Sequence, residues 1–142
     1  MNVRQPEPTF FVDQNLTGEF VAHLRLAGLK VEQLQDHLDP TAPDVEWIPF
    51  VGARGWVVIT LDQFRGDPEE QVALMVHGVK VFIIVGQGTQ RQRADLFLRE
   101  LKWIRRTIAA SSDPFMARLS MMGKHTLTTL DDFMNRQARR RR

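Results

Sequence analysis

The sequence contains no cysteine among its 142 residues. It therefore has no disulfide framework, and no thiolate is available as a metal ligand or a nucleophile. No apolar run approaches the roughly 18 residues that a membrane-spanning helix needs. The opening segment MNVRQPEPTF also lacks the apolar core of a signal peptide. From these absences we expect a cytoplasmic protein that does not associate with membranes.

What is present is the composition of an ordinary globular domain, with 43% apolar and 25% charged residues. The small net charge of +2 conceals an uneven distribution. Residues 1–88 hold 6 Lys and Arg against 12 Asp and Glu, whereas residues 89–142 hold 13 against 5. This division predicts an acidic functional region beside a basic region that faces a polyanion.

Apolar, β-rich runs alternate along the chain with segments of helical periodicity. Strands are expected over residues 9–13, 29–34, 55–62 and 80–85, and two short strands within 114–130 around Met122–Lys124. Helices are expected over residues 15–27, from Pro43 to the glycines at 52 and 55, over 68–77, and as one long helix from an N-cap at Thr89 to Ile108. This order predicts an α/β fold whose mainly parallel sheet is covered on both faces.

Aspartates stand at positions that this topology brings together. Asp13 and Asp62 each close an apolar strand, and Asp44 begins the helix that precedes the second of these strands. Carboxyl ends of parallel strands meet at one edge of a sheet, where open α/β sheets bind ligands. Three converging carboxylates repel one another unless a cation lies between them, and all-oxygen ligands suit Mg²⁺ or Mn²⁺. The alternative is that each aspartate only starts a turn or caps a helix.

Three segments resemble a known family. They are Phe11–Leu16 (FVDQNL), Thr41–Trp47 (TAPDVEW) and Gly55–Asp62 (GWVVITLD). In sequence and order they are similar to the PIN-like domains related to VapC toxins, which are Mg²⁺- or Mn²⁺-dependent ribonucleases of bacterial toxin–antitoxin modules. The similarity runs from residue 9 to about 108. It implies a three-layer α/β/α PIN-like fold, with a single nuclease domain over residues 1–130 followed by a basic, flexible tail over 131–142.

The resemblance also assigns site residues. It implies that Asp13, Asp44 and Asp62 are catalytic and hold the metal, and that Asn15 contacts the metal or its water. Two departures are visible. Residue 14 is glutamine where related sequences often have glutamate, and residues 63–65 (QFR) lack an aspartate that many relatives carry after Asp62. Glu46 and Glu70 are candidates for the missing carboxylate, although a solvated surface position is the interpretation favoured for both.

The basic half supplies candidate RNA contacts. These are Arg91 and Arg93 in the first turns after Gly86–Gly88, and Arg99, Lys102 and Arg106 at helical spacing. A solvated helix face is the alternative interpretation. The tail arginines 139–142 would add salt-sensitive affinity for nucleic acid. RNA is thus one expected partner, and the family resemblance adds a cognate antitoxin protein and a homodimer, with Met121 or Phe133 as contacts.

The sequence therefore leads to one main hypothesis, a PIN-like, metal-dependent endoribonuclease that is the toxin of a toxin–antitoxin pair. A catalytically silent PIN-like module that binds RNA or protein is the competing hypothesis, favoured by the thinned set of acids. A nucleotide-binding regulatory domain is a third, because Gly86 and Gly88 follow a strand. Arg91 occupies the third glycine position of a dinucleotide-binding loop, so this last signal is weak.

Overall fold

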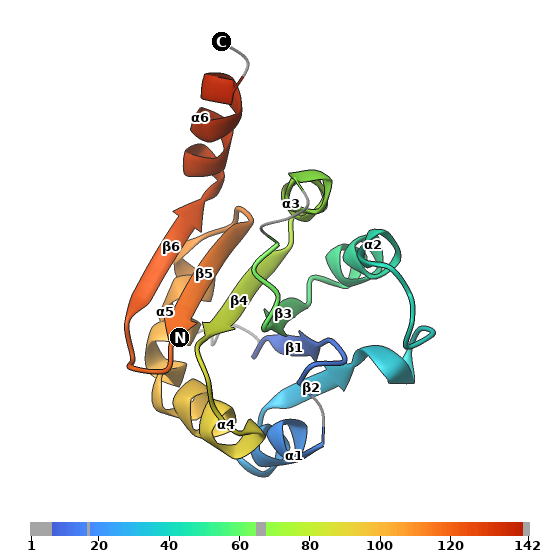
Figure 1. Ribbon diagram of the computed structural model, residues 1–142, viewed down its shortest axis with the longest axis vertical. Helices are drawn as coiled ribbons and strands as arrows, with labels where there is room; N and C mark the ends of the chain where they lie inside the picture. The colour runs from blue at the N-terminus through green and yellow to red at the C-terminus, as the bar shows by residue number, and fades with distance from the viewer. Residues whose placement is uncertain (1–6, 17, 65–67, 141–142) are drawn as a thin grey trace, which may run out of the picture.

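The computed structural model describes residues 7–16, 18–64 and 68–140, which form a sheet between two layers of helices (Figure 1). Within these residues the sheet has the strand order β2-β1-β3-β4-β5-β6. Its strands are β1 Thr9–Val12, β2 Lys30–Gln33, β3 Val57–Thr60, β4 Lys80–Val85, β5 Phe115–Ser120 and β6 His125–Thr129. Neighbouring strands are parallel except β6, which runs antiparallel to β5. The predicted mainly parallel sheet is confirmed.

Helices cover both faces of the sheet, as the unbroken apolar strands predicted. Their bounds are α1 Glu19–Leu26, α2 Asp44–Arg54, α3 Pro68–Val76, α4 Gln90–Arg99, α5 Leu101–Ala110 and α6 Leu130–Arg140, with a short 3-10 turn at Leu34–Asp36. Buried residues of α1, α4 and α5 share one core with the sheet, and those of α2, α3 and α6 share the other. The fold is thus the expected three-layer α/β/α arrangement.

Strand β1 shows how one strand serves both cores. Successive side chains of a strand point to opposite faces of the sheet. Phe10 packs edge-to-face against Phe97 of α4 with a centroid distance of 5.3 Å, whereas Phe11 lies 5.8 Å from the Trp47 ring of α2. Both phenylalanines are fully buried. This double burial explains why the strand is a continuous apolar run rather than an alternating one.

The long helix predicted from Thr89 to Ile108 is divided in two. Its start is confirmed, because the Thr89 hydroxyl accepts from the Gln92 amide at 3.1 Å and the Gln92 side chain accepts from the Thr89 amide at 2.8 Å. At Glu100 the backbone leaves the helix with φ −93° and ψ 7°. The Glu100 carboxylate there contacts the His125 ring of β6 at 2.9 Å. This contact with the sheet fixes the junction between α4 and α5.

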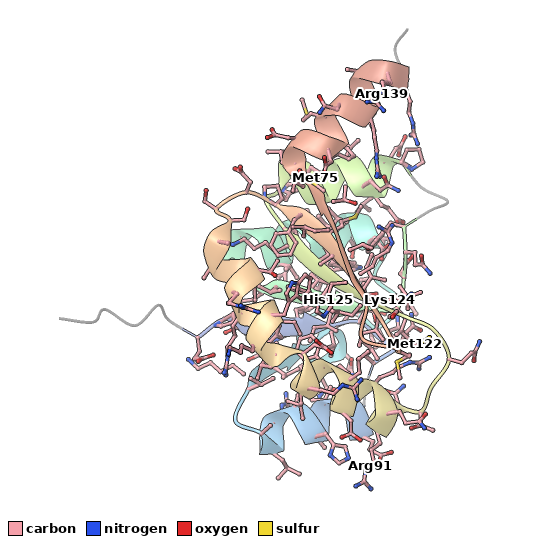
Figure 2. All side chains as sticks on the ribbon, turned by 90° about the vertical axis from the view of Figure 1, so that its left-hand side faces the viewer. Met75, Arg91, Met122, Lys124, His125 and Arg139 are labelled. Carbon is pink, nitrogen blue, oxygen red and sulfur yellow. The ribbon has the colours of Figure 1, made fainter. Side chains whose placement is uncertain are left out.

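The sequence predicts a flexible segment over residues 131–142, but residues 130–140 form helix α6. The structure shows two local causes. Thr129 and Asp132 bond each other's main-chain amides at 3.1 Å in a reciprocal cap, and Phe133 is buried against the α2–α3 layer. Arg139 and Arg91 lie at opposite ends of the molecule, so the arginines of α6 and of α4 are not one patch (Figure 2). Arg141 and Arg142 lie outside the described residues.

None of the helices in the described ranges combines the length and the apolar character needed to cross a membrane.

Candidate metal centre

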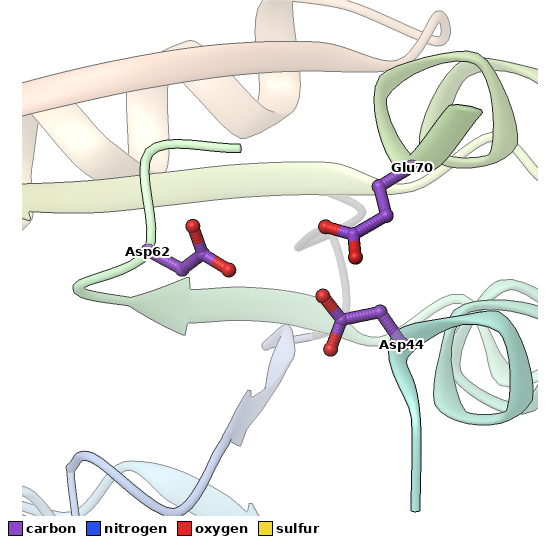
Figure 3. Close-up of side chains that lie close together, drawn as sticks. All are labelled: Asp44, Asp62 and Glu70. Carbon is purple, nitrogen blue, oxygen red and sulfur yellow. The ribbon is translucent and has the colours of Figure 1, made fainter. Parts of the chain in front are cut away.

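Three carboxylates from three different elements meet beside the sheet. Asp44 is the first residue of α2, Asp62 follows β3, and Glu70 lies in the first turn of α3. Each offers an oxygen within 4.8 Å of an oxygen of the other two. Figure 3 shows the side chains converging on a common space. We call Asp44, Asp62 and Glu70 the acid group.

Helices α2 and α3 run side by side and bring two of these acids together. Near their ends, a Cβ on Gly52 would lie 2.6 Å from the carbonyl oxygen of His77, so only glycine permits this approach. Near their starts, Asp44 meets Glu70. Of the two glycines at which the sequence predicts the helix end, α2 continues through Gly52 and stops at Gly55, which has the left-handed φ of 67°.

The loop after β3 holds Asp62 in place through its own main chain. The Asp62 amide donates to the Thr60 hydroxyl at 3.0 Å, and the Phe64 amide donates to Asp62 Oδ1 at 2.8 Å. Phe64 has a φ of 54°, which is uncommon for a bulky residue, yet its side chain is buried. The Gln71 side chain of α3 donates to the Phe64 carbonyl at 2.6 Å. Asp62 is thereby tied to the helix that carries Glu70.

Asp44 is fixed by the residue one helical turn ahead. The indole Nε1 of Trp47, a buried side chain, donates to Asp44 Oδ1 at 2.6 Å. A carboxylate at a helix start is also stabilised by the helix dipole. One oxygen of Asp44 is thus held by the indole while the side chain stays half-buried beside its two acidic neighbours.

Asp13 lies at the end of β1. The charges of Asp44 and Asp62 act on it, but it is not part of the acid group. Among the described residues it is not one of the acids that meet within 4.8 Å. Its Oδ2 accepts from the Thr60 hydroxyl at 2.5 Å and its Oδ1 from the Asn15 amide at 3.2 Å. Burial raises the pKa of Asp13 above its usual 3.8; these two hydrogen bonds oppose the shift, and the charges of Asp44 and Asp62 add to it. Asp13 therefore carries its negative charge at a cost.

This donor set fits a hard divalent cation. All the donors are carboxylate oxygens, which Mg²⁺ and Mn²⁺ prefer over the nitrogen and sulfur ligands of zinc. Asp62 is exposed while Asp44 and Glu70 are half-buried, so the group is open to solvent on one side. A cation between the carboxylates would offset both their mutual repulsion and the cost of charging Asp13.

The structure thus brings Asp44 and Asp62 together and adds Glu70, for which the sequence favoured a solvated position. Glu46 is exposed and lies outside the acid group in the described part of the chain. Asn15 is exposed, and its carbonyl accepts from the Gln90 side chain at 3.0 Å. The metal-contacting role of Asn15 stays a prediction.

The predicted RNA contacts are spread over two helices. Arg91 is exposed in the first turn of α4, and the half-buried Arg93 donates to the Gly86 carbonyl at 3.4 Å. Arg99 is exposed and lies 3.8 Å from the Glu100 carboxylate. Lys102 and Arg106 are exposed on α5. None of these contacts tests RNA binding, which stays a prediction.

The glycines after β4 have a packing role. A Cβ on Gly88 would lie 2.9 Å from Met121 Cε, and a Cβ on Gly86 would lie 3.1 Å from Met121 Cγ. The two glycines therefore make room for Met121, which packs against the core formed with α1, α4 and α5. Met121 and the buried Phe133 both pack against the cores of the chain, and their roles as contacts for a second copy stay predictions.

Comparison with known proteins supports the family suggested by the sequence. The model of a family described as "PIN like domain" matches residues 8–86, more than half of the chain. The matched range spans β1 to β4 and contains Asp13 and the complete acid group. No curated protein and no solved structure matches the chain. Because this match covers more than half of the chain, the protein belongs to the PIN-like domain family, and its mainly parallel sheet between two helical layers agrees with that assignment.

Proposed function

We propose that this protein is a Mg²⁺- or Mn²⁺-dependent endoribonuclease. The observation that carries the proposal is the acid group, in which Asp44, Asp62 and Glu70 from three elements approach within 4.8 Å. PIN domains are generally nucleases, and the family match covers the residues that hold this group. Hydrolysis of a phosphodiester is a reaction for which clustered carboxylates and a divalent cation are suited.

In the proposed mechanism the acid group would hold the cation, and Asp13 would contribute its charge from the end of β1. A bound divalent cation polarises a phosphoryl oxygen and lowers the pKa of a coordinated water. The hydrogen bonds from Trp47 to Asp44 and from Phe64 to Asp62 keep the carboxylates in place before substrate arrives. We propose Arg91, which is exposed at the start of α4, as a contact for RNA phosphates together with the helix-start amides.

As its biological role we propose the toxin of a type II toxin–antitoxin module, with a cognate antitoxin protein as partner. Support comes from the resemblance of residues 11–16, 41–47 and 55–62 to VapC-related domains. The competing function is a silent PIN-like module that binds RNA or protein, favoured by glutamine at positions 14 and 63. Glu70 weakens that alternative because it supplies a third carboxylate to the acid group.

Cleavage of labelled RNA by the purified protein tests the enzymatic proposal. We expect cleavage that requires Mn²⁺ or Mg²⁺ and is lost on chelation. Asp62→Asn should lower the rate of RNA cleavage by at least about 100-fold, because it removes one negative charge from the proposed cation site. A 100-fold loss corresponds to about 2.8 kcal/mol of transition-state stabilisation, at about 1.4 kcal/mol for each factor of ten. Asp95→Asn, an exposed aspartate of α4, is the matched control and should leave the rate unchanged. RNA binding without cleavage under all conditions would instead support the silent module.

A further inference from the structure

The two edge strands of the sheet, β2 and β6, differ in how their outward main-chain groups are bonded. At β2 the Arg25 side chain donates twice to the Val31 carbonyl, from Nη2 at 2.7 Å and from Nε at 3.3 Å, and so occupies a main-chain acceptor of this outermost strand. At β6 no other strand of the described residues pairs with the outer side. Native proteins usually protect such edges, because unpaired main-chain groups invite another strand.

The hairpin geometry determines which groups of β6 face outward. The Ser120 amide donates to the Lys124 carbonyl at 2.9 Å, and the register then pairs Arg118 with Thr126 and Met116 with Thr128. Because hydrogen-bonded pairs alternate along an antiparallel ladder, the main-chain groups of the intervening residues point away from β5. These outward residues are His125, Leu127 and Thr129.

Most of these outward main-chain groups make no hydrogen bond within the described residues. The Thr129 amide is already taken, since it donates to Asp132 in the cap of α6 at 3.1 Å. The amides and carbonyls of His125 and Leu127 and the carbonyl of Thr129 remain directed outward. The side chain of Leu127 is 44% exposed, so the middle of the edge is apolar as well as unpaired.

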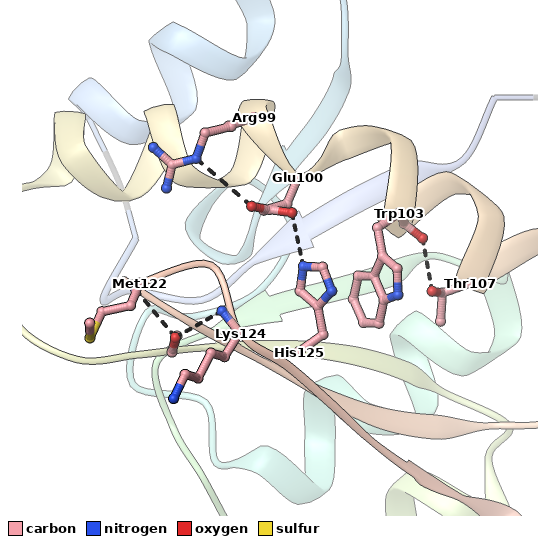
Figure 4. Close-up of polar contacts among 8 residues, drawn as sticks. Arg99, Glu100, Trp103, Thr107, Met122, Lys124 and His125 are labelled. Atoms are coloured by element: carbon pink, nitrogen blue, oxygen red, sulfur yellow. Dashed lines mark hydrogen bonds and ion pairs between the residues drawn. The ribbon is translucent and has the colours of Figure 1, made fainter.

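The start of β6 is anchored by contacts to Trp103 of α5 and to Glu100, which precedes that helix (Figure 4). The His125 ring stacks on Trp103 at a centroid distance of 4.0 Å and an interplanar angle of 14°, while it contacts Glu100 at 2.9 Å. Beside this stack a groove of about 610 Å³, lined by Trp103, Phe115 and Leu127 among others, lies between α5 and β6. A strand that adds here would meet a preformed edge and an apolar groove.

We propose that a second copy of this chain pairs with β6 in antiparallel orientation, about a twofold axis at Leu127. The two sheets would then continue into each other across the axis. Leu127 meets Leu127 of the second copy, and the two residues exchange both main-chain hydrogen bonds. The His125 amide meets the Thr129 carbonyl of the other copy, and the twofold axis repeats this bond. The register is self-complementary, because the outward groups of one copy face the outward groups of the other.

Charge favours a second copy as the occupant of the edge. Lys124 immediately precedes β6 and Asp131 closely follows it, and both side chains are exposed. Antiparallel pairing centred on Leu127 places Lys124 opposite Leu130 of the other copy, next to its Asp131. The axis creates this opposite-charge pair twice, flanking an apolar centre of two leucines. An isologous interface requires a surface that is complementary to itself in this way.

The association state of the full-length chain tests this interface. Sedimentation equilibrium is expected to show a dimer for the wild type and a monomer for Leu127→Lys, because an edge lysine opposes strand pairing. Leu26→Lys, which replaces an 85% exposed leucine of α1, is the matched control and should remain dimeric. Lys124→Glu and Asp131→Lys should each weaken the dimer, and their combination should restore it. A monomeric wild type, or a Leu127→Lys variant as dimeric as the wild type, would overturn the proposal.

The absence of cysteine allows a second test of the register. Hydrogen-bonded residues that face each other in an antiparallel pair have Cα atoms about 5.5 Å apart, within the range that a disulfide spans. Leu127→Cys is therefore expected to form a covalent dimer under mild oxidation, whereas Leu26→Cys should not. Leu127→Pro adds a control for folding, because the Leu127 amide points away from β5 and proline is tolerated there. It should stay folded by circular dichroism and be monomeric. Cross-linking of both cysteine variants alike, or of neither, would contradict the register.

Discussion

Replacing Glu70 with glutamine is expected to weaken Mn²⁺ binding by at least about 10-fold. Even residues that only support a metal ligand typically change its affinity by about 10- to 100-fold. Glu70 offers its carboxylate within 4.8 Å of Asp44 and Asp62 oxygens, so it is a candidate ligand itself. The amide keeps the size of the side chain but removes its charge. Titration with Mn²⁺, followed by calorimetry, measures the change.

Glu69→Gln is the control for this experiment. Glu69 is adjacent in the first turn of α3, but it is exposed and is not one of the three acids that meet. It should therefore leave Mn²⁺ affinity close to that of the wild type. RNA cleavage should follow the same order, with the Glu70 variant impaired and the Glu69 variant active. Equal affinities in the two variants would remove Glu70 from the metal centre.

Replacing Asp13 with asparagine is expected to raise the melting temperature in metal-free buffer. The pKa of Asp13 is raised, first by burial and further by Asp44 and Asp62, so its charged form is less favourable in the folded than in the unfolded chain. At neutral pH the wild type bears this cost and the asparagine variant does not. Each 1 kcal/mol of stabilisation moves the melting temperature by about 4 °C in a domain of this size, so even a small gain is measurable.

The sign of the pH dependence follows from the same shift. A group whose pKa is raised on folding binds protons more readily in the folded state, so the wild type recovers stability as pH falls through that pKa. The gap between the variant and the wild type should be widest at neutral pH and should close in acid. Thermal unfolding in chelator at several pH values measures it, with Asp95→Asn as an exposed control. Because asparagine has one acceptor oxygen for the two hydrogen bonds of Asp13, the pH dependence is the decisive readout: a difference between the two proteins that is independent of pH would contradict the assigned cost of this charge.

The parallel sheet and its helical layers could be predicted because the strands β1, β3 and β4 are unbroken apolar runs. Burial on both faces removes the polar alternation of a half-exposed strand, and Phe10 with Phe11 in opposite cores is an example. The proximity of Asp44 and Asp62 could also be predicted. Asp62 follows the end of strand β3, and Asp44 begins α2, the helix that precedes this strand, so both lie at the same edge of the sheet. Their roles as metal ligands, like that of Asp13, stay predictions.

Glu70, which the sequence names only as a less favoured candidate, and helix α6 show where the sequence pattern is insufficient. Glu70 reaches the acid group because α3 packs beside α2, which is a property of packing between distant segments. For α6 a local signal existed, because Thr129 and Asp132 have the spacing of a helix cap. The charged composition of residues 131–142 concealed this signal and suggested a flexible tail.

The candidate metal centre and the proposed contact between copies lie in different parts of the chain. Residues 8–86 carry the acid group, whereas α4 to α6 and the β5–β6 hairpin lie beyond the matched range. The hairpin places an unprotected strand at the sheet edge farthest from β2. The proposed metal centre and the proposed contact between copies can therefore be tested independently, because no residue belongs to both.

Direct measurement of bound Mn²⁺ tests the central claim, that carboxylates from separate elements form one cation site. Electron paramagnetic resonance reports free Mn²⁺ during titration of the wild type and of a double variant, Asp44→Asn with Asp62→Asn. We predict saturable binding by the wild type and its loss in the double variant, with both proteins folded by circular dichroism. Binding of the same affinity and stoichiometry in the double variant would contradict the account.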